Sequence, residues 1–280
     1  MIQTIKFKCE TITPLFLAGA DGKTPELRAP SIKGALRFWW RALNANLVNN
    51  EDYTELKRQE SAIFGGTDSS GRSKVIISID NQTTKKITAH PTPHKERPFS
   101  KSAFAIGSKF EIAVNVIDNT VMTAEQVKSL FIIVTLLGGI GNRSRRGFGS
   151  FKITEINDIE FEQPNDVEAI EDIINSINPS YPFANISANY PFVKSIEIGQ
   201  ADSDITLKIG KATHSVKENN GRGYGDAMGD SSPRFSSPIY VSVIKKADDK
   251  LYPIITTLNT VPPNGRVNVS IQQTFKSKLL

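Results

Sequence analysis

Apolar and polar positions alternate at the start of the chain and then change to a longer period. In residues 2–9, three apolar side chains fall on one side and two lysines on the other, which predicts a half-buried strand. Apolar residues then recur at helical spacing over residues 32–47, which predicts a helix capped by Ser31. A second helical stretch over residues 51–64 is expected to end at Gly65.

The pattern then predicts a strand, a second strand, a helix and a third strand, over residues 73–80, 108–118, 123–137 and 150–156. Thr123 and Gln126 have the spacing of a capping box at the start of this helix. With the first strand and helix, the order is β-α-β-β-α-β plus one extra helix. This order defines the ferredoxin-like unit, a fold that also serves as an RNA-recognition module.

The composition changes after Ile159, where an acidic amphipathic helix over residues 165–178 is interpreted as a domain junction. Beyond it we expect a strand, a helix, a glycine-rich loop and a hairpin, over residues 192–198, 205–219, 219–237 and 238–258. This succession suggests a second, less regular copy of the same unit. The sequence therefore predicts an α+β fold of two ferredoxin-like units packed together, with domains at 1–160 and 161–280.

Composition limits the class of protein. The 280 residues are 39% hydrophobic and 22% charged, which is ordinary for a soluble globular chain. No apolar run approaches 18 residues, and the chain opens on a strand pattern instead of a signal peptide. Cys9 is the only cysteine, so a disulfide or a cysteine metal cluster is excluded. We expect a cytoplasmic protein with no membrane partner, no metal and no cofactor.

Charge is unevenly distributed along the chain. The net charge is +5, yet residues 153–193 contain no lysine or arginine and eight acidic residues between 155 and 172. Positive charge gathers at residues 23–41, 72–109 and 143–152. Segregation of this kind is typical of proteins that bind polyanions. A solvated helix face, or a contact with another subunit, would explain the acidic stretch equally well.

Residues 138–150, GGIGNRSRRGFGS, follow the most apolar helix and have the pattern G-φ-G-x5-G-φ-G, where φ is apolar. A nucleotide-binding P-loop would need a lysine after its last glycine and a helix after the loop. Here Phe148 follows Gly147, and the loop leads into a strand. The dinucleotide fingerprint also fails, because Ser144 occupies the place of its third glycine. Two interpretations stay open: a tight helix-to-strand connection, and a cradle for a polynucleotide backbone.

The loop's residue types favour the second interpretation. Its glycines, Gly139, Gly141, Gly147 and Gly149, allow close approach of a ligand and positive φ, and the apolar residue between each pair can point into the core. Three arginines, Arg143, Arg145 and Arg146, are expected to project from the exposed part. Their planar guanidinium groups suit phosphate.

The helix over residues 32–47 carries a second basic group. Lys33, Arg37 and Arg41 are spaced by four, so they line up about 6 Å apart on one helix face, a spacing close to that of successive phosphates. Trp39 belongs to the apolar stripe. Trp40 lies beside the cations, where it would either stack on a base or pack in the core or against another subunit.

Other basic residues are weaker candidates. Lys23 and Arg28 precede this helix and are expected near its start, where free N–H groups favour anions. Secondary candidates flank the loops: Arg72, Lys95, Arg97, Lys101, Arg222 and Arg234.

Several segments resemble one protein family. The glycine pattern at the end of a ferredoxin-like unit is similar to the signature of the RAMP superfamily of CRISPR proteins. Residues 13–43, TPLFLAGADGKTPELRAPSIKGALRFWWRAL, resemble the opening of the first Cmr subunits of type III-B effector complexes. ESAIFGG at 60–66, with the strand segment after it, resembles that family's next block, and RFSSPIYVSVIK at 234–245 is also similar.

This resemblance implies two ferredoxin-like units and a non-catalytic subunit of a ribonucleoprotein complex that works in antiviral defence. Its partners would be the other Cmr subunits and single-stranded RNA, either the 3′ region of the crRNA or captured target RNA. The basic helix and the glycine loop would then bind RNA backbone.

Two alternatives to an RNA-binding subunit are kept. RAMP ribonucleases often use a histidine base, and this chain has His90, His94 and His214. His90 and His94 lie in a proline-rich loop, and His214 stands alone on a helix. Asp21 lies in a loop comparable to the one in which RAMP backbone subunits carry a cleaving aspartate, although Asp-Gly is a common turn dipeptide. The second alternative is a purely structural subunit whose basic surface meets acidic neighbours.

Overall fold

The computed structural model describes residues 1–67, 71–117, 121–183, 189–221, 223–263 and 265–280. Five antiparallel strands form the first sheet, in the order β2-β5-β1-β6-β7. They are β1 (Ile2–Thr11), β2 (Val75–Thr83), β5 (Lys109–Ile117), β6 (Phe151–Ile156) and β7 (Ile159–Glu160). The first four strands have the 2-3-1-4 order of a ferredoxin-like unit, as predicted.

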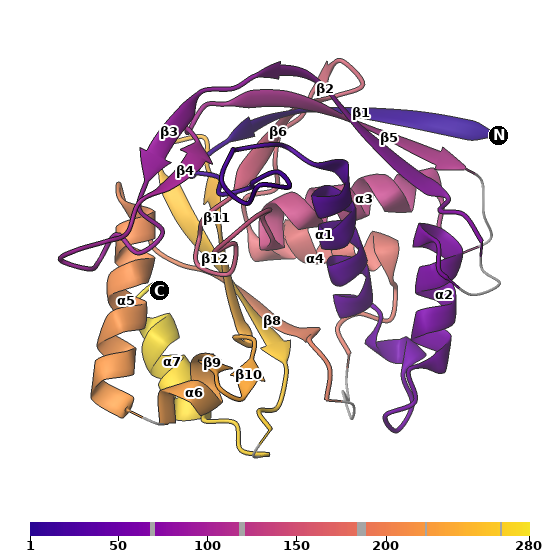
Figure 1. The fold of residues 1–280 in the computed structure, drawn as a ribbon. Helices are drawn as coiled ribbons and strands as arrows, with labels where there is room; N and C mark the ends of the chain where they lie inside the picture. Colours follow the sequence, from indigo (N-terminus) through magenta and orange to yellow (C-terminus); the bar gives the residue numbers. More distant parts are fainter. Residues whose placement is uncertain (68–70, 118–120, 184–188, 222, 264) are drawn as a thin grey trace.

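Helices cover one face of this sheet (Figure 1). They are α1 (Ala29–Ala42), α2 (Thr54–Phe64), α3 (Ala124–Leu137) and α4 (Val167–Ile177), with a short 3-10 turn at Ala45–Leu47. The predicted capping box is present: the Thr123 hydroxyl accepts from the Gln126 N–H at 3.2 Å, and the Thr123 N–H donates to the Gln126 side chain at 3.0 Å. The second predicted helix, α2, starts at Thr54 instead of residue 51 and ends before Gly65, which has φ 82°, as expected.

The first helix differs from its prediction at both ends. It starts at Ala29, with Arg28 at the N-cap and Pro30 in the first turn, so Ser31 is not its cap. Proline suits the first turn because it lacks an N–H that would need a partner there. The helix also ends at Ala42 instead of Leu47, and the 3-10 turn follows it.

The second sheet has the order β11-β12-β8 and is antiparallel. Its strands are β8 (Phe192–Ile198), β11 (Ile239–Lys245) and β12 (Leu251–Asn259). Along the chain, the helix α5 (Ile205–Asn220) follows β8, and the helix α7 (Val269–Ser277) follows β12. This arrangement matches strands two, three and one of a ferredoxin-like unit, with no fourth strand in the described residues. The predicted second, less regular copy is therefore confirmed.

The sequence patterns missed several short elements. The segment between the strands predicted over residues 73–80 and 108–118 forms a hairpin of β3 (Lys86–Ala89) and β4 (Lys101–Phe104). The expected glycine-rich loop at 219–237 contains α6 (Gly223–Met228) and a hairpin of β9 (Asp230–Ser231) and β10 (Arg234–Phe235). Elements of two to six residues are too short to show a period.

The second sheet lies between two helical layers (Figure 1). On β11, Val241 and Val243 pack with α5 and α7 residues, whereas Tyr240 and Ile244 pack with α1 and α3. Burial on both faces explains why this strand lacks polar alternation. The larger hydrophobic cluster thus includes residues on both sides of the boundary expected at 160/161, and that boundary stays a prediction.

Candidate nucleic-acid interface

The glycine loop joins α3 to β6 and also touches the second sheet. Gly147 N–H donates to the Val241 carbonyl at 2.8 Å, and Val241 N–H donates to the Arg145 carbonyl at 3.3 Å. Arg146 forms a parallel bridge with Val241. The loop therefore extends the β11 edge of the second sheet with backbone from the first unit.

The four glycines of the motif all have positive φ, between 68° and 147°. A Cβ atom at Gly141 would lie 2.3 Å from the Phe16 carbonyl oxygen, and one at Gly149 would lie 2.0 Å from that of Ile140. As predicted, the two apolar residues between the glycine pairs, Ile140 and Phe148, are buried. The glycines are thus required by packing of the loop against its own chain, whatever ligand the loop binds.

Arg145 and Arg146 do not project into solvent as expected. Arg145 is half-buried and donates to the Ser237 carbonyl, and its guanidinium lies 5.4 Å from the Phe38 ring centre and 5.2 Å from that of Tyr240. Arg146 donates to the carbonyls of Ile239 at 3.1 Å and Met228 at 3.2 Å. Burial lowers the pKa of Arg145. Both side chains join the two units because main-chain carbonyls of the second unit accept their N–H groups.

Arg143 is the arginine that keeps its charged end available. Its backbone has φ 66°, and its Nε donates to the Pro91 carbonyl at 3.0 Å. Within the described part of the chain, its two terminal nitrogens have no hydrogen-bond partner. Burial lowers the pKa of Arg143, and the neighbouring Arg146 lowers it further. Because the partly buried guanidinium of Arg143 has no acidic side chain as a partner, an anionic ligand would stabilise its charge.

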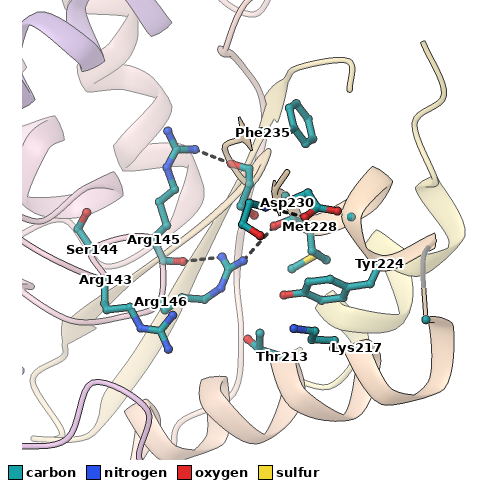
Figure 2. Close-up of a pocket in the computed structure, with 15 residues that line it drawn as sticks. Arg143, Ser144, Arg145, Arg146, Thr213, Lys217, Tyr224, Met228, Asp230 and Phe235 are labelled. Atoms are coloured by element: carbon teal, nitrogen blue, oxygen red, sulfur yellow. Dashed lines mark hydrogen bonds between the residues drawn. The ribbon is translucent and has the colours of Figure 1, made fainter. Parts of the chain in front are cut away.

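The three arginines line a cavity of about 630 Å³ between the glycine loop, α5, α6 and the β9–β10 hairpin (Figure 2). Lys217 of α5 is exposed and also lines it, and its amine has no hydrogen-bond partner among the described residues. Tyr224, Asp230 and Phe235 complete the wall that faces the loop. Backbone N–H groups of Ser232 and Ser231 lower the pKa of Asp230.

Sequence reasoning missed Lys217 and Tyr224. Lys217 lies four residues after Thr213, another α5 residue that lines the cavity. This spacing shows from the sequence only that the two residues share one face of the helix. Nothing local in the sequence shows that this face of α5 opposes the glycine loop.

The basic column on α1 is partly neutralised. Arg37 Nε donates to Glu60 at 2.6 Å, and Arg41 donates to the same carboxylate oxygen. Glu60 is only 6% exposed. Burial lowers the pKa of Lys33, and the neighbouring Arg37 lowers it further. Arg37 and Arg41 therefore contact α2, whereas Arg145 contacts Phe38 on another face of α1.

Both tryptophans of α1 are core residues. Trp39 is 1% exposed and Trp40 is 3% exposed. Trp40 packs edge-on against Phe64, with ring centres 6.5 Å apart. The interpretation of Trp40 as a base-stacking residue is therefore wrong for this conformation, because a base needs an open ring face.

The remaining basic candidates are dispersed. Arg28 lies at the start of α1 as expected, 4.0 Å from Glu26, and Lys23 lies in an exposed turn. Arg234 is exposed on β10. Arg222 lies outside the described residues. Arg72, Lys95, Arg97 and Lys101 line none of the cavities beside the glycine loop.

The residues considered for catalysis do not line the 630 Å³ cavity, although His94 lines a smaller pocket next to it with Arg143 and Arg146. His94 and His214 are neighbours, with ring centres 5.3 Å apart, so the expectation that His214 stands alone is wrong. His214 also pairs with Glu218 at 3.1 Å. Asp21 is a turn residue that accepts the N–H groups of Lys23 and Thr24, each at 2.9 Å, and bonds from Thr24 and Lys23 lower its pKa to about 2. No histidine of the described chain lines the 630 Å³ cavity.

Comparison with known proteins decides the family. A sequence profile of the RAMP superfamily matches residues 8–152, which is more than half of the chain and includes the glycine loop. The chain belongs to the RAMP superfamily. Two curated relatives come from Pyrococcus furiosus (strain ATCC 43587 / DSM 3638 / JCM 8422 / Vc1): the CRISPR system Cmr subunits Cmr1-2 and Cmr1-1.

The similarity to Cmr1-2 is 29% identity over 185 residues, covering 55% of this chain and 96% of that relative. For Cmr1-1 it is 34% over 164 residues, covering 53% of this chain and 47% of that relative. The chain therefore spans about half the length of Cmr1-1.

Solved structures of similar fold cover nearly the whole chain. The crystal structure of Cmr1 from Pyrococcus furiosus in its apo form has a TM-score of 0.69 at 19% identity, over 99% of this chain and 97% of that one. A chain of the type III-B Cmr-beta structure bound to cognate target RNA and AMPPnP, in the presence of ssDNA, has a TM-score of 0.61 at 13% identity, over 98% of each chain. At these identities the likeness establishes the fold.

No helix in the described residues combines the length and apolar character needed to cross a membrane.

Proposed function

We propose that this chain is a non-catalytic, RNA-binding subunit of a type III-B CRISPR effector complex, and that it holds single-stranded RNA in the cavity beside the glycine loop. The RNA is either the 3′ region of the crRNA or captured target RNA. The partners are the other subunits of the Cmr complex, and the setting is the cytoplasm. Similarity to the Cmr1 subunits supports this assignment.

One observation carries the proposal: Arg143 and Lys217 come from different units and line the same cavity, and the terminal nitrogens of Arg143 and the amine of Lys217 bind no protein acceptor among the described residues. Cations held in this way suit phosphate, which is the constant feature of any RNA sequence. Arg145 and Arg146 contribute positive potential and hold the walls together.

The position of the acid–base candidates supports a non-catalytic role. His94 has its Nδ1 atom buried without a partner in the described structure, and Asp21 is engaged by its own turn. General acid–base cleavage would need one of them within hydrogen-bond reach of a ribose hydroxyl. Arg143 and Lys217 line the cavity and can bind phosphate, but neither of these cations supplies the general base that cleavage would need.

The test uses the full chain and a labelled single-stranded RNA of about 20 nucleotides. We expect the Arg143→Ala/Lys217→Gln variant to bind at least about tenfold more weakly than wild type, roughly 1.4 kcal/mol, and the RNA to stay intact on a denaturing gel. The matched control, Arg58→Ala/Lys211→Gln, removes two exposed cations outside the cavity and should bind like wild type. Cleaved RNA would support the nuclease alternative, and unchanged binding by the cavity variant would support a purely structural subunit.

A further inference from the structure

An aromatic ring lies beside the free cations of the cavity. Tyr224 of α6 is half-buried and packs on the cluster formed by residues such as Ile209, Val216 and Phe275. Figure 2 shows its ring directed into the cavity next to Lys217. Because its buried side is fixed by the core, the ring can contact a ligand with little further loss of side-chain freedom.

The cavity has opposite charges at different walls. Arg143 and Lys217 lie on the loop and α5 sides, and Asp230 lies on the hairpin side beside Phe235 (Figure 2). The Asp230 carboxylate accepts two backbone N–H groups, from Ser231 at 2.6 Å and Ser232 at 3.2 Å. An ionised carboxylate repels a phosphate but accepts hydrogen bonds from the N–H groups of a base. The hairpin side therefore suits a base, and the loop side suits a phosphate.

We propose that one nucleotide of the bound RNA enters this cavity, with its base stacked on Tyr224 and its phosphate between Arg143 and Lys217. This inference rests on the proposed function and adds a base contact to it. The volume of about 630 Å³ lies in the range of sites that enclose one small ligand. Stacking on a tyrosine does not depend on base identity, so the contact can serve guides or targets of any sequence.

The test compares two strands of ten nucleotides, oligouridylate and a strand with the same ribose phosphates but no bases. Tyr224→Ala should bind oligouridylate about 5- to 150-fold more weakly than wild type, with an unchanged salt dependence because no charge is removed. Tyr224→Phe should bind within about twofold of wild type, since the ring is kept. Tyr252→Ala, a tyrosine outside the cavity, is the matched control.

The abasic strand tests the contact on wild-type protein alone. It should bind wild type about as weakly as oligouridylate binds Tyr224→Ala, and one restored uracil should regain affinity. Equal binding of both strands by wild type would overturn the base contact, and so would a Tyr224→Ala defect that persists with the abasic strand. If the base contact fails but wild type still binds oligouridylate in a salt-dependent way, the proposed function stands. If wild type shows no salt-dependent binding of oligouridylate, the proposed function itself is refuted.

Discussion

Arg143, Arg145 and Arg146 are neighbours in sequence, yet their guanidinium groups contact different partners. Arg146 bonds carbonyls 82 and 93 residues away, and Arg145 bonds one 92 residues away. Of the three, only Arg143 has both terminal nitrogens without a hydrogen-bond partner in the described structure. The sequence predicted three equivalent arginines because such long-range acceptors leave no local signal.

This difference predicts opposite effects of two substitutions. Arg146→Ala should lower the free energy of unfolding by roughly 2–3 kcal/mol, since it removes the Arg146 donor from the Met228 carbonyl and one of two side-chain donors from the Ile239 carbonyl. Arg143→Ala should change stability by less than about 1 kcal/mol but weaken RNA binding. Urea unfolding and RNA titration of both variants check this, and equal stability losses would contradict the assigned roles.

The glycine loop permits a second comparison at single residues. Gly149→Ala should destabilise by roughly 2–5 kcal/mol, because positive φ and a clash with the Ile140 carbonyl act together. Gly22 has the same φ of 68° with open space around its Cβ position, so Gly22→Ala should cost only about 1–2 kcal/mol. Thermal unfolding measures both values, and similar losses would show that φ alone matters.

Elements meet through a few buried polar contacts. Glu60 of α2 binds Arg37 and Arg41 of α1, so Glu60→Gln should lower stability by roughly 1–3 kcal/mol, less than for a fully buried pair because both arginines are partly exposed. Glu55→Gln removes an exposed carboxylate of the same helix and should cost under about 0.5 kcal/mol. Chemical denaturation separates the two variants, and equal costs would mean that Glu60 does not join the helices.

The β3–β4 insertion contacts α5 through His94. Burial lowers the pKa of His94, and His214, Arg143 and Lys95 lower it further, while Glu218 faces His214. His94 is therefore protonated near pH 6.5 in the unfolded chain but only at lower pH in the folded chain. Its neutral, partly buried form contributes to the free energy of unfolding above that pH, and this contribution is lost as the pH falls. Urea unfolding at pH 7.5 and 5.5 should show a smaller decrease for His94→Gln than for wild type, with exposed His90→Gln as the control. An equal decrease would exclude His94 as the cause.

Local patterns predicted most long elements, because a capping box, a glycine stop or a helical period depends on residues within one turn of each other. Thr123 with Gln126, and Gly65 after α2, are examples. The cavity could not be predicted in the same way. Lys217 and Tyr224 line it because α5 and α6 fold back against a loop some 70 residues earlier, and Trp40 was misjudged because Phe64 of another helix covers it.

At the scale of the whole molecule, the glycine loop belongs to both units: it starts β6 of the first sheet and extends β11 of the second. A cavity with walls from both units follows from that arrangement (Figure 2). The central claim is that RNA phosphate contacts the free cations at this junction.

The salt dependence of single-stranded RNA binding tests this claim most directly. Each phosphate contact contributes a slope of about −0.7 to log affinity against log salt, so Arg143→Ala/Lys217→Gln should reduce the magnitude of the wild-type slope by about 1.4. Arg58→Ala/Lys211→Gln should leave the slope unchanged. A cavity variant with the wild-type slope would contradict the account, because the phosphates would then lie elsewhere on the molecule.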